Sequence, residues 1–172
     1  FELREYESMV IVETTIDDDF ENAGNKAFKR LFAYITGNNV SNTEISMTAP
    51  VIADPAETNP GTDIAMTAPV LQEYSPGGWR YAFVLPAELT LETAPKPIDD
   101  KVRLAEVPGK QVAVVQFSGF WSEQSMQEKT AELKNWITGN NLTAISEPRW
   151  AGYNPPWTIP FLRRNEVMID VQ

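Results

Sequence analysis

The order of apolar and polar positions predicts two similar units along the chain. Each unit opens with a run of β-branched residues that is typical of a strand, at residues 10–16 and again at residues 112–117. A segment with apolar residues three and four positions apart follows each run and predicts an amphipathic helix. The helix positions are Phe20, Ala23, Ala27, Leu31 and Ile35 in the first unit and Met126, Thr130, Leu133 and Ile137 in the second. We therefore expect both helices to pack one face on a sheet.

The residues that flank the predicted helices support their positions. Asp17-Asp18-Asp19 and Ser122-Glu123 come just before them, where acidic and hydroxyl groups accept hydrogen bonds from the free amides of a first turn. Gly37 and Gly139 follow the last apolar positions, and glycine commonly ends a helix. We expect both helices to end at these glycines.

A direct sequence repeat supports the two units. Residues 34–39 read YITGNN and residues 136–141 read WITGNN, so five of six residues are identical at an offset of 102 positions. The same offset aligns the predicted strands and the helix stripes of the two units. We expect residues 9–52 to superpose on residues 111–154 as a rotated half-barrel.

A second repeat lies inside the first unit. The octamer ISMTAPVI at residues 45–52 returns as IAMTAPVL at residues 64–71, and both copies are predicted to be strands of one sheet. The intervening residues 54–63 contain Pro55, Pro60 and Gly61, which favour turns, so we expect them to be exposed. Further strands are predicted at residues 81–85 and 163–171, and an extended linker at residues 94–100, which include Pro95 and Pro97.

The predicted order is strand, helix, strands, and then the same order again. We therefore predict a single α+β domain over residues 1–172. Its two pseudo-symmetric βαββ-like halves form a distorted antiparallel barrel or sheet with two main helices packed on it, and a cleft lies between the halves. A chain of 172 residues with 42% hydrophobic content is large enough to close one such core.

Composition excludes several classes of function. Lys and Arg total 14 against 24 Asp and Glu, and the formal net charge of −10 repels nucleic acids and anionic lipid surfaces. The absence of Cys and His excludes disulfides, thiolate zinc sites, Ser-His-Asp triads and a histidine-ligated heme. The acidic residues at 17–19 lack the further ligands of a calcium loop. We expect no nucleic-acid partner, no metal site and no catalytic residue.

Hydropathy gives no sign of an integral membrane segment. Charged or polar residues interrupt every apolar run before it reaches the roughly 18 to 20 residues of a spanning helix. We therefore expect a soluble protein. Because the sequence begins at Phe1, its localisation is left open between the cytoplasm and export after removal of an N-terminal signal.

Several motifs, in this order, resemble the SOUL heme-binding protein family. They are the two MTAPV octamers, residues 30–39, the FSG segment at residues 117–119, the YNPP segment at residues 153–156 and the RRNEV segment at residues 163–167. The resemblance runs from about Glu2 to the C-terminus. It implies a barrel of two βαββ-like halves, related to the effector-binding domains of multidrug-responsive transcription regulators. It also implies porphyrin binding in a hydrophobic crevice beside the first helix.

We therefore expect the chain to hold heme or another tetrapyrrole without catalysis, as a carrier or buffer. The candidate ligand-binding residues are Phe28, Lys29, Arg30, Leu31, Phe32, Met47 and Met66. The apolar side chains would form a wall for the macrocycle, and the two cations would pair with propionates. The methionines are possible axial ligands, although methionine in a repeated strand octamer more often fills core gaps. Without His or Cys ligation, apolar contact is expected to provide most of the affinity.

An alternative function is a small-molecule effector-binding or hydrolase module of the related fold. In this interpretation Glu166 receives a cationic ligand or acts as a general base, and aromatic residues of the cleft contact the ligand. Trp150, Tyr153 and Trp157 either line such a slot or close one end of the barrel.

Overall fold

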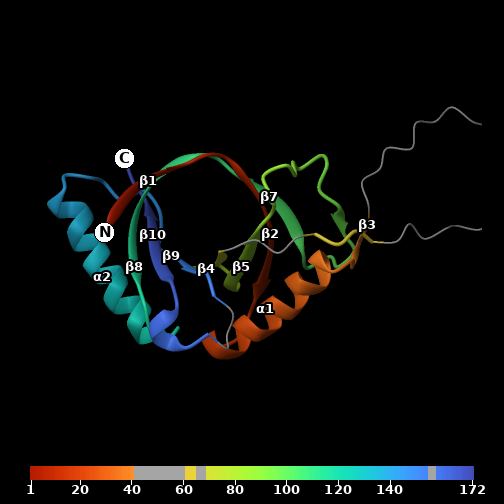
Figure 1. The fold of residues 1–172 in the computed structure, drawn as a ribbon, viewed down its shortest axis with the longest axis horizontal. Coiled ribbons are helices and arrows are strands. Elements are labelled where there is room, and N and C mark those ends of the chain that lie inside the picture. The colour runs from red at the N-terminus through yellow and green to blue at the C-terminus, as the bar shows by residue number, and fades with distance from the viewer. Residues whose placement is uncertain (41–60, 65–68, 155–157) are drawn as a thin grey trace, which may run out of the picture.

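The computed structural model describes residues 1–40, 61–64, 69–154 and 158–172. Within them, an eight-stranded antiparallel sheet curls into a half-barrel, and helices α1 (Phe20–Ile35) and α2 (Glu123–Gly139) lie on its outer face (Figure 1). The sheet strands are β1 (Glu2–Tyr6), β2 (Met9–Ile16), β4 (Val70–Ser75), β5 (Gly78–Val84), β7 (Arg103–Val107), β8 (Lys110–Phe117), β9 (Arg149–Gly152) and β10 (Asn165–Asp170). The short strands β3 (Asn39–Val40) and β6 (Lys96–Pro97) pair separately, and η1 (Pro160–Leu162) is a 3₁₀ turn. The predicted α+β class is confirmed.

The strand order shows how the two units are joined. From one edge to the other the order is β1-β8-β10-β9-β4-β5-β2-β7, which is symmetric about the central β9–β4 pair. β1 precedes β2 in the sequence and β7 precedes β8, yet β1 pairs with β8 and β7 pairs with β2. Each unit therefore gives its first strand to the other unit, and we call β1 and β7 the exchanged strands.

The strands repeat at a different offset from the helices. β2 and β8 begin at Met9 and Lys110, 101 positions apart, and each has four consecutive buried residues, 11–14 and 112–115. An offset of 102 would align Val12, which packs under α1, with Val114, which lies on the opposite, concave face. Because a shift of one residue moves a side chain to the other face of a sheet, the predicted offset is corrected to 101 in the strands. The superposition of the complete halves stays a prediction.

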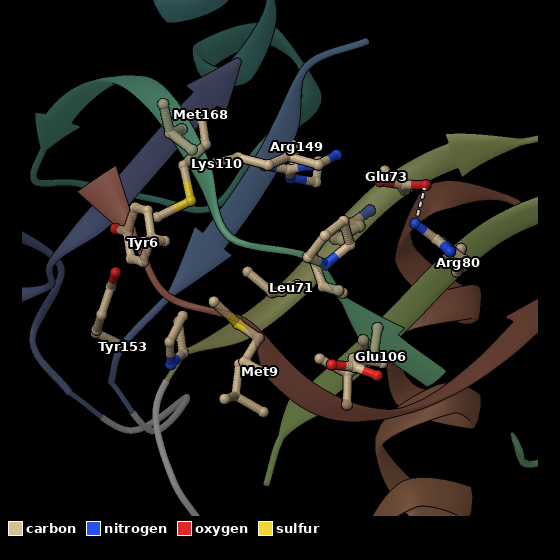
Figure 2. A pocket seen from close by; sticks show the side chains of 18 residues that line it. Tyr6, Met9, Leu71, Glu73, Arg80, Glu106, Lys110, Arg149, Tyr153 and Met168 are labelled. Carbon is tan, nitrogen blue, oxygen red and sulfur yellow. Dashed lines mark ion pairs between the residues drawn. The ribbon is translucent and has the colours of Figure 1, made fainter. Parts of the chain in front are cut away.

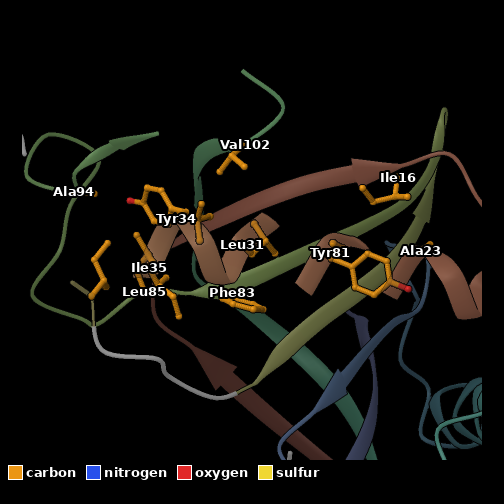
Figure 3. Close-up of a cluster of buried hydrophobic side chains, with 13 residues drawn as sticks. Ile16, Ala23, Leu31, Tyr34, Ile35, Tyr81, Phe83, Leu85, Ala94 and Val102 are labelled. Atoms are coloured by element: carbon orange, nitrogen blue, oxygen red, sulfur yellow. The ribbon is translucent and has the colours of Figure 1, made fainter. Parts of the chain in front are cut away.

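Helix α1 has most of the predicted buried face, but Phe20 is only half-buried and packs against the core under α2. Asp19 caps α1 by accepting a hydrogen bond from the amide of Asn22 at 2.9 Å. The residues of its buried face are Ala23, Ala27, Leu31, Tyr34 and Ile35, and they pack on Val12, Ile16, Tyr81, Phe83 and Leu85 of the sheet (Figure 3). Tyr34, which was not in the predicted stripe, donates its hydroxyl proton to the carbonyl of Pro95 at 2.7 Å. Burial raises the pKa of Tyr34 to about 12, so it stays a neutral donor.

Helix α2 packs in the same way but ends differently. Ser122 is its N-cap, and Met126, Leu133 and Ile137 are buried against β8 and β10. α1 ends as predicted, with Gly37 just beyond it at a φ of +103°. α2 instead continues through Gly139, and the residue with positive φ is Asn141, at 57°. α2 thus ends at Gly139 as predicted, but this glycine is the last helical residue, and the left-handed residue comes two positions later.

The first-half strands differ in part from the octamer pattern. β4 begins only at Val70, and Ile64 lies outside any strand, donating its amide proton to the carbonyl of Ile35 at 2.7 Å. The first octamer, at residues 45–52, and residues 65–68 of the second lie outside the described residues. The predicted strands at residues 81–85 and 163–171 correspond to β5 and β10, and the predicted linker contains β6. No helix within the described ranges is long and apolar enough to cross a membrane.

Candidate functional site

The concave face of the half-barrel contains a pocket of about 450 Å³. This volume lies in the range of small-molecule sites, about 300 to 1,000 Å³. Strands from both halves contribute to it, so the pocket lies where the sequence predicted a cleft between the halves. Its largest apolar wall residues are Met9, Ile11, Leu71, Val84, Val112 and Met168 (Figure 2).

Charged side chains lie at separate ends of this pocket. Lys110 and Arg149 lie together at one end, whereas Arg80 and Glu73 lie at another (Figure 2). Glu106 comes from the exchanged strand β7 and also lines the wall. The pocket therefore combines a mostly apolar wall with a few placed ionic groups, as small-molecule sites commonly do.

In the described part of the chain, three fully buried carboxylates lie on strands of the half-barrel, and each is paired with cations. Glu13 on β2 binds Arg80 and Arg103. Glu166 and Asp170 on β10 alternate with Val167 and Ile169, which face α2, so both carboxylates face the concave side. Burial of an unpaired charge is very costly, and these ion pairs offset that cost. Among the described residues no group of three or more Asp and Glu side chains is placed to hold a metal ion.

Glu166 has no free acceptor position for a substrate. Arg4 binds both its carboxylate oxygens at 3.0 Å, Tyr153 donates to Oε2 at 2.7 Å, and Arg164 donates twice to Oε1. Burial alone would raise the pKa of Glu166, but these hydrogen bonds outweigh it and hold the pKa below its ordinary value. A general base near neutrality needs a raised pKa and access to its substrate. The geometry therefore favours a structural role for Glu166.

Asp170 is held in the same way at the cationic end of the pocket. Its carboxylate accepts hydrogen bonds from Lys110 at 2.6 Å and from both terminal nitrogens of Arg149. Burial alone would raise the pKa of Asp170, but the hydrogen bonds from Arg149 and Lys110 have the larger, opposite effect and hold the pKa below its ordinary value. The side chains of Lys110 and Arg149 remain 35% and 18% exposed, which leaves both accessible from the pocket.

The lowered pKa values predict loss of stability in acid. A carboxylate whose pKa is lower in the folded state contributes its full stability above the unfolded pKa and loses it as the pH falls through the folded pKa. For Glu166 and Asp170 the ordinary values are 4.5 and 3.8. We expect the urea midpoint to be nearly constant from about pH 7 to about pH 5 and to fall below about pH 4. In a Glu166→Gln variant the urea midpoint should fall less steeply below about pH 4. An equally steep fall would show that Glu166 does not contribute to the loss of stability in acid.

The residues predicted on helix α1 fall into two groups. Leu31 is fully buried in the core, and Arg30 is engaged with Asp99 and the hydroxyl of Thr14. Phe28 and Phe32 are 38% and 42% exposed, and their rings stack with centroids 5.7 Å apart. Lys29, Phe28 and Phe32 thus lie on the outer surface of the half-barrel, not on its concave face. Met47 and Met66 lie outside the described residues.

The predicted aromatic cluster near the C-terminus is divided between the two faces of the sheet. Trp150 is buried under α2 beside Trp79, whereas Tyr153 lines the pocket and bonds Glu166. Trp157 lies outside the described residues. Of the two interpretations of this cluster, Tyr153 fits a ligand slot and Trp150 fits core packing.

Sequence reasoning did not find most of the pocket residues. Lys110, Arg149 and Asp170 are far apart in the sequence and match no motif. One available signal was the run of four consecutive apolar residues in each strand, at residues 9–12 in β2 and 112–115 in β8, since a strand with one solvated face alternates apolar and polar residues. Such a run indicates that the second face is also covered or lines a pocket.

The model of the family described as SOUL heme-binding protein matches residues 1–170. The chain belongs to this family. Two curated relatives carry names that fit it. Heme-binding protein 1 of Xenopus tropicalis is 27% identical over 168 residues, covering 97% of this chain and 81% of the relative. Heme-binding protein 2 of Homo sapiens is 27% identical over 174 residues, covering 100% of this chain and 78% of the relative.

The SOUL fold of this chain also resembles solved structures of very different sequence. A hydrolase from Listeria innocua superposes with a TM-score of 0.60 and 13% identity, covering 99% of this chain and 91% of the other. At this identity the likeness shows the shared fold alone. For this SOUL protein, function must therefore be argued from the pocket and from the family.

Proposed function

We propose that this chain binds heme or another tetrapyrrole in the concave pocket, as a carrier or buffer that does not transform its ligand. The observation that supports this most strongly is the pocket itself, with an apolar wall and a pair of cations at one end. A macrocycle needs apolar surface, and its propionates need cations. The family and the names of both curated relatives agree with a heme-type ligand.

The side chains of the pocket fit heme without histidine or cysteine. Heme, when bound, brings an iron that accepts axial ligands, and methionine thioethers are among the protein groups that bind it. Met9 and Met168 both line the pocket, and either can contact the macrocycle by packing alone. Apolar contact is then the main source of affinity, which matches the expectation from the sequence.

Titration with hemin, followed through the Soret band, tests the proposal. We expect saturable one-to-one binding by the wild-type chain. Ala82 lines the pocket, and an Ala82→Trp substitution fills it, so the variant should bind at least about tenfold more weakly if its circular dichroism is unchanged. Only diffuse, non-saturable absorption by the wild type would contradict the proposal.

The same titration separates the pocket from the site predicted on α1. Phe28→Ser and Phe32→Ser alter the exposed aromatic pair and leave the concave face untouched. If hemin occupies the pocket, these variants bind as the wild type does. If they lose binding while Ala82→Trp keeps it, the ligand lies on the surface of α1, as the sequence predicted.

A further inference from the structure

The pseudo-symmetry of the sheet pairs each pocket position in one half with a position in the other. At the strand offset of 101, Lys110 corresponds to Met9 and Val112 to Ile11. Val112 pairs with Asp170 across β8 and β10, and Ile11 pairs with Val84 across β2 and β5, so Asp170 corresponds to Val84.

The counterpart of Arg149 follows from the next residue pairs along the same strands. Met168 pairs with Arg149 across β10 and β9. The counterpart of Met168 is Ala82, which pairs with Leu71, so Arg149 corresponds to Leu71. The charged group Lys110–Asp170–Arg149 thus has an apolar counterpart, Met9–Val84–Leu71. The fold is symmetric here, but the chemistry of the pocket is not.

Charge balance singles out the same group. Arg80 and Arg103 are matched by Glu13 and Glu73, and the ion pairs around the second buried carboxylate are balanced in the same way by Arg4, Arg164, Glu166 and Glu2. Lys110 and Arg149 share a single carboxylate, Asp170. Of these three groups among the described residues, the one at Asp170 alone has a surplus positive charge, and both of its cations line the pocket.

The opposite end of the pocket is apolar. Met9 pairs with Val107 of β7, and both line the pocket. Glu106 pairs with Val10, which packs against the core under α1, so its side chain projects to that face of β7 and not towards Met9. A carboxylate near Met9 would meet an apolar wall, whereas a carboxylate near Lys110 and Arg149 would meet the surplus positive charge. The two ends therefore favour a single orientation for a ligand with one charged edge and one apolar edge.

We propose that Lys110 and Arg149, held in place by Asp170, form a carboxylate-binding subsite that orients an amphipathic carboxylate in the pocket, with its apolar edge against Met9, Leu71 and Val84. This inference rests on the proposed function and deepens it, because the two propionates of a natural porphyrin lie on one edge of the macrocycle. A long-chain fatty acid has the same chemistry, and the experiment separates these two sources.

Protoporphyrin IX and its dimethyl ester, which lacks the carboxylates, are titrated against the full chain by quenching of tryptophan fluorescence. In the test variant, Lys110→Met, the residue found at the symmetric position replaces the lysine, and Arg149 remains to pair with Asp170. We expect this variant to bind protoporphyrin IX about tenfold more weakly and the ester as the wild type does, within about twofold. Lys110→Arg should retain the tighter binding of protoporphyrin IX.

Arg103→Met is the matched control. It also removes one of two cations from a buried carboxylate, Glu13, but Arg103 does not line the pocket and its side chain is 71% exposed. We expect it to bind both porphyrins as the wild type does. An equal loss in both variants would show that Lys110→Met acts through the fold and would overturn the subsite.

The remaining outcomes distinguish this subsite from the proposed function. If acid and ester bind equally and Lys110→Met changes neither, the subsite is wrong and tetrapyrrole binding stands. If neither porphyrin binds but palmitate does, with a dependence on Lys110, the subsite stands and the proposed ligand is wrong. If none of the three ligands binds, both proposals fail.

Discussion

Glu166→Ala is expected to lower the free energy of unfolding by about 3 to 5 kcal/mol, the usual effect of removing one partner of a buried ion pair. The substitution removes five hydrogen bonds and leaves Arg4, whose side chain is 20% exposed, and Tyr153 without their shared acceptor. It also removes a charged link between the exchanged strand β1 and β10, although β1 keeps its backbone pairing with β8. Urea denaturation followed by circular dichroism at neutral pH measures the change.

Glu2→Ala is the control for this prediction. Glu2 pairs with the same arginine but lies at the surface, where an ion pair contributes little to stability. We expect its unfolding curve to overlay that of the wild type. A Glu166→Ala variant as stable as Glu2→Ala would show that the buried network does not hold β1 in place.

Leu31→Ala is expected to lower the free energy of unfolding by about 3 kcal/mol, because Leu31 is fully buried and its truncation leaves a cavity between α1 and the sheet. Phe32→Ala, one position further along the same helix, removes a larger side chain that is 42% exposed. We expect a change of only about 1 kcal/mol for it, since its ring is partly exposed and stacks on Phe28, a type of contact that contributes about 0.5 to 1.5 kcal/mol. Thermal and urea unfolding of both variants check the ranking, and a larger loss for Phe32→Ala would contradict the placement of Leu31 in the core and Phe32 at the surface.

The arrangement of the elements could be predicted because their signals are local. The apolar stripe of α1, its Asp19 cap and the β-branched runs of β2 and β8 act within a few residues of one another, and the structure confirms each of them. The offset was misjudged because one residue is inserted between strand and helix in the second unit. Identity at residues 34–39 and 136–141 measures the register of the helix ends and carries no information about the strands.

The pocket could not be predicted because its chemistry is assembled from distant strands. Asp170 meets Lys110 from 60 positions away and Arg149 from 21 positions away. Neither exchanged strand was predicted, since Glu2–Tyr6 and Arg103–Val107 are short and contain charged residues. Without β1 and β7 in place, no sequence pattern assigns Tyr6 or Glu106 to the pocket, and the aromatic residues on α1 are the more visible candidates.

The exchanged strands also determine when the protein can fold during its synthesis. When the ribosome has made the first unit, β2 still lacks the neighbour that β7 will provide, and β1 has no partner until β8 has been made. An unpaired strand edge is prone to bind other chains. Both edges of the sheet can therefore pair as in the native fold only after β8 has been synthesised. The ion pair of Arg4 forms later still, because Glu166 lies on β10. The nascent chain thus has a long interval in which chaperone binding is most useful, and folding is expected to be slow because these contacts join residues far apart in the sequence.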